Sequence, residues 1–253
     1  MNAESTHLRV ITPVITEGLR DIADLRALQG PGLRISHTLL KEGPSSIESV
    51  FEEMLAAPGV VAEGLRAQAE GCDGIIIDCF GDPGLQAARE MLSIPVFGPG
   101  QASMHMAGML SQRFSIVTVL ESVRPMLTDL AHRYGVSGLL ASIRVIDIPV
   151  LALSTDPGSL LQAMATEACR AVRDDGADLI VLGCTGFLGC AEAVAAELKK
   201  QGLDVPVIDP IPTTVRMAQA AAQAGLRHGK RGWPTPTVKP IGGFAQLQAA
   251  MNL

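Results

Sequence analysis

The chain has few aromatic residues and little charge of either sign. Aromatic side chains make up 3% of its 253 residues and charged side chains 18%, whereas hydrophobic residues account for 47%. This composition excludes an intrinsically disordered chain and is typical of an α/β protein with an aliphatic core. The length suffices for one large domain or two domains of about 125 residues each.

Clusters of basic residues are also missing. No run of lysine and arginine is longer than two, and the net charge is −6. Nucleic acids and anionic membranes are bound through clustered positive charge, so the expected partner is a small molecule. No apolar run approaches the roughly 18 residues of a membrane-spanning helix, and the first seven residues lack the features of a signal peptide. We therefore expect a cytoplasmic protein.

The short motifs of nucleotide and metal sites do not occur either. Neither G-x-G-x-x-G nor G-x-x-x-x-G-K-[ST] is present, which leaves a dinucleotide or P-loop function without support. Cys184 and Cys190 have no histidine at a recognised zinc spacing, so no metal is expected. The five cysteines are an odd number, which indicates free thiols in a reducing compartment rather than a disulfide framework.

What the chain does contain is one stretch that occurs twice. Residues 71–81 align without a gap with residues 176–186, and the aligned Cys79 and Cys184 are 105 positions apart. The continuous apolar run in each copy predicts a buried parallel strand that ends near the cysteine. Ligands bind at the carboxyl ends of such strands. Two halves of this design would each offer one thiol to a cleft between them.

Strands and helices alternate through both halves, which implies two lobes with doubly wound parallel sheets. Besides the two cysteine strands, we expect strands over residues 8–14, 33–40, 94–97, 114–120, 143–153 and 205–208. The expected helices include one that starts at Thr16, one from Ile47 that is capped by Ser45 or Ser46 and broken at Pro58 and Gly59, and an alanine-rich helix over 213–224.

The repeated cysteines are the candidates for chemistry. Cys72, Cys169 and Cys190 have no counterpart in the other half and are expected to be inert. Cys79 and Cys184 both precede a predicted helix, whose backbone N–H groups and dipole stabilise a thiolate. Two thiols suit a reaction that takes a proton from one face of a carbon and returns one to the other face. No cofactor is needed where a neighbouring carbonyl acidifies that carbon.

Five segments, residues 42–48, 79–85, 117–119, 182–186 and 225–232, together resemble the hydantoin and allantoin racemase branch of the aspartate/glutamate racemase superfamily. The resemblance extends over about residues 9–232. It implies a cofactor-independent racemase, expected as a homo-oligomer, with Cys79 and Cys184 as its acid/base pair. It also implies two pseudo-symmetric α/β domains, residues 1–100 with 210–253 and residues 101–209, around the active site.

The resemblance further implies residues that line the substrate pocket and offer backbone N–H groups to substrate oxygens. These are Thr12, Pro13, Gly43, Pro44, Asp78, Phe80, Thr118, Val119, Thr185 and Gly186. Many family members carry Asn-Pro-Asn-Thr where this chain has Thr12-Pro13-Val14-Ile15, so two amide side chains are absent here. The substrate is therefore expected to be less polar or differently anchored at this position.

Two other classes of function stay open. An isomerase or decarboxylase on the same scaffold, acting on maleate or an arylmalonate, would use the cysteines as nucleophile or proton donor. Retention of both cysteines argues against a decarboxylase with a single thiol. A non-catalytic binding protein shares the two-lobed design, but it has no need for a thiol at both strand ends.

His37 and the tail at 226–253 are expected to be structural.

Overall fold

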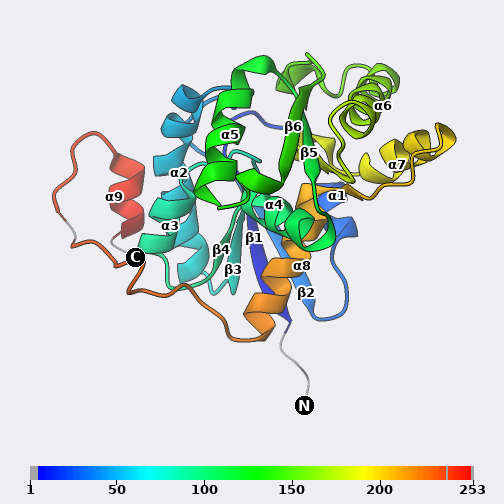
Figure 1. Ribbon diagram of the computed structural model, residues 1–253. Helices are drawn as coiled ribbons and strands as arrows, with labels where there is room; N and C mark the ends of the chain where they lie inside the picture. Colours follow the sequence, from blue (N-terminus) through cyan, green and yellow to red (C-terminus); the bar gives the residue numbers. More distant parts are fainter. Residues whose placement is uncertain (1–4, 238, 252–253) are drawn as a thin grey trace. The chain divides into compact units, whose positions relative to one another are not determined.

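The computed structural model describes residues 5–237 and 239–251. Within these residues two four-stranded sheets form, with the orders β2-β1-β3-β4 and β6-β5-β7-β8, and neighbouring strands are parallel (Figure 1). The first sheet contains β1 (Thr6–Thr12), β2 (Leu33–Leu39), β3 (Gly74–Ile77) and β4 (Val96–Phe97). The second contains β5 (Phe114–Thr118), β6 (Leu140–Val145), β7 (Leu179–Leu182) and β8 (Val207–Ile208). The prediction of two pseudo-symmetric, doubly wound parallel sheets is confirmed.

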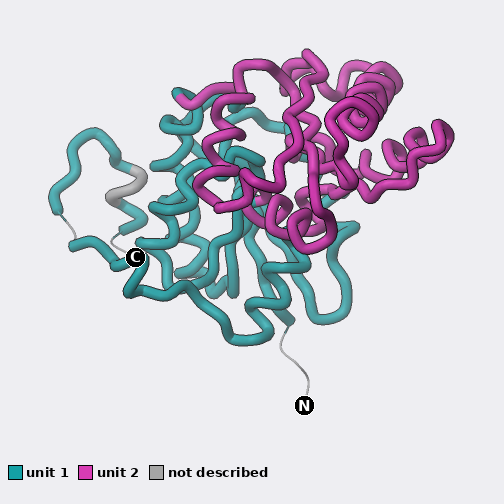
Figure 2. The backbone as a smooth tube through the Cα atoms, viewed as in Figure 1, with its two compact units in different colours: residues 1–47, 51–98, 214–253 teal, residues 48–50, 99–213 magenta. Residues whose placement is uncertain are grey.

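The chain divides into two compact units (Figure 2). One comprises residues 1–47, 51–98 and 214–253, and the other comprises residues 48–50 and 99–213. Each unit holds one sheet, and the chain returns to the first unit after completing the second. Residues 1–4, 238 and 252–253, which belong to the expected first domain, lie outside the described residues.

The helices follow the strands in alternation. They are α1 (Ile22–Ala27), α2 (Val50–Ala69), α3 (Leu85–Met91), α4 (Pro99–Leu110), α5 (Arg124–Arg133), α6 (Pro157–Arg173), α7 (Ala191–Lys200), α8 (Pro210–Gln223) and α9 (Ala245–Met251). Short 3-10 turns occupy Glu121–Val123, Ser137–Leu139, Val150–Ala152 and Thr185–Phe187. No helix in the described part of the chain is long and apolar enough to cross a membrane.

The central strands form the core of each unit. Every residue of β3, β5 and β7 is buried. A strand buried along its whole length must be covered on both faces, which explains why the sequence shows continuous apolar runs here instead of alternation. The expectation of a fully buried strand before each repeated cysteine is confirmed.

The first helix starts later than predicted. We expected it at Thr16, but α1 begins at Ile22, after Asp21 accepts a hydrogen bond from the backbone N–H of Ala23 at 2.7 Å. The Thr16 hydroxyl instead donates to the carbonyl oxygen of Ser45 at 2.7 Å. This hydroxyl holds two loops together, and the prediction of a cap at Thr16 was wrong.

Helix α2 also differs from the prediction. It begins at Val50, so neither Ser45 nor Ser46 caps it, and it continues through Pro58 to Ala69. A Cβ atom at residue 59 would lie 2.9 Å from Leu40 Cδ1, so glycine lets the helix pack closely at this point. A proline inside a helix costs about 3 kcal/mol, and burial of apolar side chains such as Val60, about 1.5 to 3 kcal/mol each, offsets that cost.

The edge strand β6 ends earlier than the predicted range of 143–153. Asp147 adopts a left-handed conformation at φ 58°, which turns the chain away from the sheet. Pro149 then removes a backbone donor, and the turn at Val150–Ala152 follows. The apolar residues beyond β6 therefore belong to a loop and a 3-10 turn, and the prediction of one long strand was wrong.

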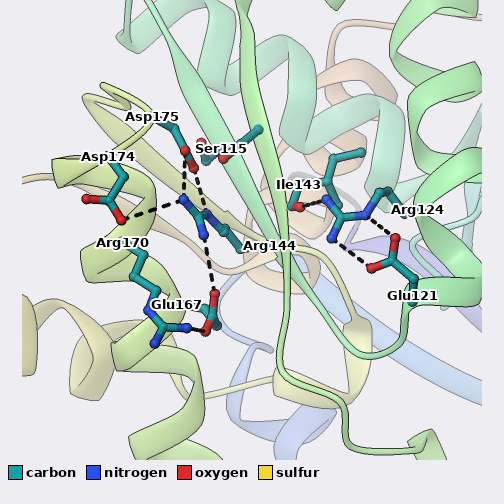
Figure 3. Close-up of polar contacts among 10 residues, drawn as sticks. Ser115, Glu121, Arg124, Ile143, Arg144, Glu167, Arg170, Asp174 and Asp175 are labelled. Carbon is teal, nitrogen blue, oxygen red and sulfur yellow. Dashed lines mark hydrogen bonds and ion pairs between the residues drawn. The ribbon is translucent and has the colours of Figure 1, made fainter.

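Arg144 anchors the edge of the second sheet (Figure 3). From β6, its Nε and Nη2 atoms donate to the two carboxylate oxygens of Asp175, each at 2.7 Å. Asp174 and Glu167 lie within 4.0 Å of the same guanidinium. The hydrogen bonds to Asp175 raise the pKa of Arg144, and they lower the pKa of Asp175. Charged groups at an edge strand also oppose pairing with a foreign strand.

The tail covers the β4 edge of the first sheet. The backbone N–H of Val96 donates to Nε2 of His228 at 2.7 Å, and the Val96 carbonyl oxygen accepts from Nε of Arg89 at 3.2 Å. The indole ring of Trp233 lies 5.4 Å from the Arg89 guanidinium and 5.5 Å from the His228 ring. Lys230 donates to the last carbonyl oxygens of α3, those of Arg89 and Glu90, at 3.0 and 2.6 Å.

This geometry requires a neutral His228, because Nε2 accepts a hydrogen bond. Burial, with the charges of Arg89 and Lys230, lowers the pKa of His228 from 6.5 to about 4. Above pH 6.5 His228 is neutral in both the folded and the unfolded chain, so we expect it not to lower the free energy of unfolding there. The free energy of unfolding should fall as the pH drops from 6.5 towards 4, by up to about 3 kcal/mol from this residue. Urea unfolding at several pH values measures this slope.

His228→Asn should flatten the pH dependence of stability, because it removes the group whose protonation breaks the bond to Val96. The burial-lowered pKa values of His7 and His37 leave a residual slope of the same sign. His132→Asn, at an exposed position on α5, serves as the control and should leave the slope as in the unmodified protein. Equal slopes in both variants would contradict the assignment.

Candidate functional site

Cys79 and Cys184 occupy equivalent positions in the two sheets. Each stands two residues beyond the end of a central strand, β3 for Cys79 and β7 for Cys184, and each is partly exposed. Cys72 precedes β3 and therefore lies at the opposite end of that strand, where its sulfur is 3.4 Å from Nδ1 of His7. Burial raises the pKa of Cys72 and of Cys169, as expected of inert core thiols.

The residue before Cys79 is the centre of a buried polar network. Asp78 accepts hydrogen bonds from Nε and Nη2 of Arg20, both at 2.8 Å, and one from Thr12 Oγ1 at 2.7 Å. The Arg20 and Asp78 side chains are 6% and 0% exposed. The carboxylate of Asp78 is therefore closed to substrate, and any contact with substrate at this residue must come from its backbone.

Thr12 continues the network to the neighbouring strand β2. Its single hydroxyl proton goes to Asp78, so the oxygen must accept the bond from Nε2 of His37 at 2.8 Å. His37 thus carries its proton on Nε2. Burial lowers the pKa of His37, the charges of Arg20 and Arg9 act in the same direction, and Asp78 opposes them. A neutral His37 is consistent with its expected structural role.

Two loops meet beside this network. The backbone N–H of Ile15 donates to the carbonyl oxygen of Pro44 at 3.0 Å, and that of Leu40 donates to Val14 at 3.0 Å. These bonds join the loops that follow β1 and β2. The structure therefore gathers seven of the candidate residues at one end of the first sheet. They are Thr12, Pro13, Gly43, Pro44, Asp78, Cys79 and Phe80, which we call the first half-site.

The loop after Cys79 is held in a sharp turn. The backbone N–H of Asp82 donates to the Cys79 carbonyl oxygen at 3.0 Å, and Asp82 has a left-handed φ of 54°. Its carboxylate packs against Gly98, where an added Cβ would lie 2.3 Å from Asp82 Cγ. Helix α3 begins at Leu85, as the sequence predicts, so Cys79 stands before its N-terminus with the loop 80–84 between them.

Cys184 does stand at the start of a helical turn. It is the N-cap of the turn Thr185–Phe187, and its sulfur accepts a hydrogen bond from the backbone N–H of Gly186 at 3.4 Å. A hydrogen bond to sulfur favours the charged thiolate over the neutral thiol. A Cβ atom at residue 186 would lie 2.7 Å from Leu153 Cδ1 and 3.4 Å from this sulfur. A larger residue at 186 would therefore have to displace the Leu153 side chain beside this sulfur.

The remaining candidates surround the end of β7. Thr118 is fully buried, and its hydroxyl donates to the carbonyl oxygen of Gly183 at 3.1 Å. A Cβ at residue 183 would lie 2.4 Å from Ile116 Cγ2, so the chain beside Cys184 also requires glycine. The second half-site consists of Thr118, Val119, Cys184, Thr185 and Gly186. As with Asp78, the side chain of Thr118 is engaged within the protein.

Asp209 fixes the far end of the loop that carries Cys184. From the end of β8, its carboxylate accepts the backbone N–H of Gly189 at 2.7 Å and that of Ile211 at 3.2 Å. Cys190 lies next to this loop. Its pKa is raised by burial and, to a smaller extent, by the charge of Asp209.

In the described residues no group of three or more His, Cys, Asp and Glu side chains is arranged to hold a metal ion.

Sequence reasoning missed Arg20, the role of His37 in the network, and Asp209. Nothing in the sequence marked Arg20, because a single arginine in a predicted helix resembles any solvated charge. Asp209 had one. The segments at 94–99 and 205–210 align, and Asp209 replaces Gly98 as the residue before the proline. A carboxylate in place of a glycine at an aligned position marked a difference between the halves.

Removing Arg20 should be strongly destabilising, because it leaves the Asp78 carboxylate buried without its partner. We expect Arg20→Met to lower the free energy of unfolding by about 3 to 5 kcal/mol in urea titrations. The matched control is Arg170→Met, which breaks an exposed pair with Glu167 at 2.6 Å and should cost about 1 kcal/mol or less.

The double variant Arg20→Met, Asp78→Asn should recover part of that loss, since no charge is then buried alone. A loss in Arg20→Met no larger than that in Arg170→Met would show that the ion pair does not hold this part of the structure.

Comparison with known proteins places these features in a family. A family model described as Asp/Glu/hydantoin racemase matches residues 12–218. The hydantoin racemase of Pseudomonas sp. (strain NS671) is 40% identical over 190 residues, 75% of this chain and 74% of that protein. The hydantoin racemase of Paenarthrobacter aurescens is 37% identical over 227 residues, 89% of this chain and 93% of that protein.

Among solved structures, allantoin racemase from Klebsiella pneumoniae matches with a TM-score of 0.89 at 38% identity, covering 96% of this chain and 99% of that one. The fold and the sequence both point to the same family. The chain belongs to the Asp/Glu/hydantoin racemase family and is an isomerase of the racemase type.

Proposed function

We propose that this protein racemises a 5-substituted hydantoin or an allantoin-like carbon acid, without a cofactor, with Cys79 and Cys184 as its acid/base pair. The observation that carries the proposal is the equivalence of the two thiols, each placed two residues beyond the central strand of a sheet with the same strand order. The names of the similar proteins, hydantoin racemase and allantoin racemase, support the substrate class.

The proposed reaction is a proton exchange at a carbon next to a carbonyl group. One cysteine, as thiolate, removes the proton from this carbon, and the electron pair moves onto the carbonyl oxygen to give an enolate. The other cysteine, as thiol, returns a proton to the opposite face, which inverts the stereocentre. The roles of the two cysteines exchange for the other enantiomer. The Gly186 N–H bonded to Cys184 sulfur supports the thiolate form of this residue.

We propose that an apolar 5-substituent is preferred over the polar ureido group of allantoin. Thr12 replaces an amide-bearing residue of the family motif, and its hydroxyl is already bonded to Asp78 and His37. The next motif amide is replaced by Val14, which is buried. Fewer polar groups are therefore left for a substrate at this position, which favours hydantoins with an alkyl or aryl substituent.

The compartment that we propose is the cytoplasm. All five cysteines are free thiols in the structure. Free thiols of this number are maintained in a reducing environment.

Single replacement of either repeated cysteine should abolish racemisation. We expect Cys79→Ser and Cys184→Ser each to lower the rate by about 100-fold or more, because each removes a general acid or base. Proton NMR in D₂O, with single enantiomers of 5-substituted hydantoins and of allantoin, follows exchange at the stereocentre, and polarimetry follows loss of rotation. Cys190→Ser, which changes a thiol at the other end of the Cys184 loop, is the matched control and should remain active.

Other outcomes would replace the proposal. Full activity in both cysteine variants would exclude the two-thiol mechanism. Turnover of maleate or an arylmalonate, without exchange of any hydantoin or allantoin, would favour the isomerase or the decarboxylase of the same scaffold. Binding of these compounds with no turnover of any of them would favour a binding protein.

A further inference from the structure

Glu48 ends the motif at residues 42–48 and belongs to neither half-site. Residues 48–50 are part of the second compact unit, although the chain on both sides of them is part of the first (Figure 2). Within the second unit, the Glu48 carbonyl oxygen accepts a hydrogen bond from Ser122 Oγ at 2.8 Å, and its Oε1 accepts one from the backbone N–H of Val150 at 2.6 Å. Glu48 therefore bonds to the segments that follow both β5 and β6.

The carboxylate of Glu48 caps the 3-10 turn Val150–Ala152. The first N–H groups of a helical turn have no partner within the turn and need an acceptor from elsewhere. Pro149 precedes this turn, and its side chain provides no capping hydrogen bond. Glu48, 102 positions away in the sequence, supplies the acceptor instead. A hydrogen bond to an ionised carboxylate is among the stronger ones in proteins, so this cap holds the turn firmly.

The capped turn leads directly to the surroundings of Cys184. Leu153 ends the turn, and its backbone N–H donates to the Val150 carbonyl oxygen at 3.3 Å. The Leu153 side chain is buried, and a Cβ added at Gly186 would lie 2.7 Å from its Cδ1. The N–H of Gly186 is the donor to the Cys184 sulfur. A displacement of Val150 would therefore reach this thiol through two packed neighbours.

The start of the same loop is held by the second half-site. Two of its backbone N–H groups donate to carbonyl oxygens there, that of Ile146 to Thr118 at 3.0 Å and that of Ile148 to Val119 at 3.2 Å. Pro149 has no N–H to donate, so the bond from Val150 to Glu48 is the next in this series. Its loss would loosen the turn that carries Leu153, while the start of the loop stays bonded.

We infer that Glu48 is a positioning residue for Cys184. By capping the turn at Val150, it holds Leu153 against Gly186 and so keeps the N–H of that glycine directed at the sulfur. The inference rests on the proposed function, in which this thiol acts as acid and base. The motif that supplies part of the first half-site thus also supplies a residue that sets the geometry of the second.

Steady-state kinetics with a 5-substituted hydantoin measure the effect on racemisation. Glu48→Ala should lower kcat by about tenfold or more and change KM by less than about twofold, because a misplaced thiol slows proton transfer and leaves binding intact. Glu48→Gln keeps an acceptor oxygen at the same reach and should retain most of the activity. Glu48→Asp, one methylene shorter, should behave as Glu48→Ala. The matched control is Glu192→Ala, an exposed carboxylate on α7 of the same unit, which should be as active as the unmodified protein.

Alkylation of the thiols with iodoacetamide tests the positioning without any substrate. Mass spectrometry of the digested protein reports Cys184 and Cys79 separately in one sample. In Glu48→Ala the pH at which Cys184 is half reactive should rise by about half a unit, because the sulfur loses part of its bond from the Gly186 N–H. Cys79 should keep its profile. Leu153→Ala should give the same shift, and the double variant should add nothing, since both changes act on one contact.

Several outcomes would overturn the inference. They are an unchanged Cys184 profile in Glu48→Ala, an equal change at Cys79, or a raised KM with kcat unaltered. A loss in Glu48→Gln as large as that in Glu48→Ala would exclude the acceptor role, and additive shifts in the double variant would exclude the route through Leu153. Far-ultraviolet circular dichroism verifies that each variant is folded. If the unmodified protein racemises neither hydantoins nor allantoin, the proposed function fails, and the alkylation profiles still decide whether Glu48 positions Cys184.

Discussion

The buried ion pair between Asp78 and Arg20 constrains the part of the molecule that carries Cys79. Asp78 is the residue before the cysteine, and its carboxylate is bonded to Arg20 and Thr12 with no exposed surface. The pair joins the end of β3 to the segment that follows β1, and through Thr12 it reaches His37 on β2. A buried pair of this kind contributes little net stability, but loss of one partner is costly, so its value is to fix one arrangement of three chain segments.

The sequence was sufficient to predict the sheets, because buried parallel strands give continuous apolar runs and the run before each cysteine is repeated. It was not sufficient for the helix boundaries. Thr16 had the chemistry of a cap but bonds to a distant loop, and Pro58 lies inside a helix that continues and packs closely on Leu40 at Gly59. Both depend on residues far away in the sequence. The same holds for Arg20, whose partner is 58 positions away.

The two half-sites hold their cysteines by different means, although the strands before them match. Cys184 starts a helical turn and accepts a backbone N–H bond, whereas Cys79 begins a longer loop before α3. Several residues that were expected to line the pocket, among them Thr118, have side chains engaged within the protein. Backbone geometry is therefore what the half-sites have in common, and in the second one Gly183 and Gly186 allow the chain to pack closely around Cys184. Sequence motifs locate such positions but do not show how their side chains are used.

A carboxylate contacts a glycine beside the loop that follows each of Cys79 and Cys184, but the acid lies on the loop in one unit and at the strand end in the other. In the first unit Asp82 projects from the loop onto Gly98 at the strand end, whereas in the second unit Asp209 projects from the strand end onto Gly189 in the loop. If the chain arose by duplication of one half, each half has since kept a single acid and a glycine facing it. A recombinant that carried both acids in one half would crowd two negative charges into one place, and one that carried neither would leave the loop unsupported. On that history, neither half could donate its segment to the other without disturbing this contact.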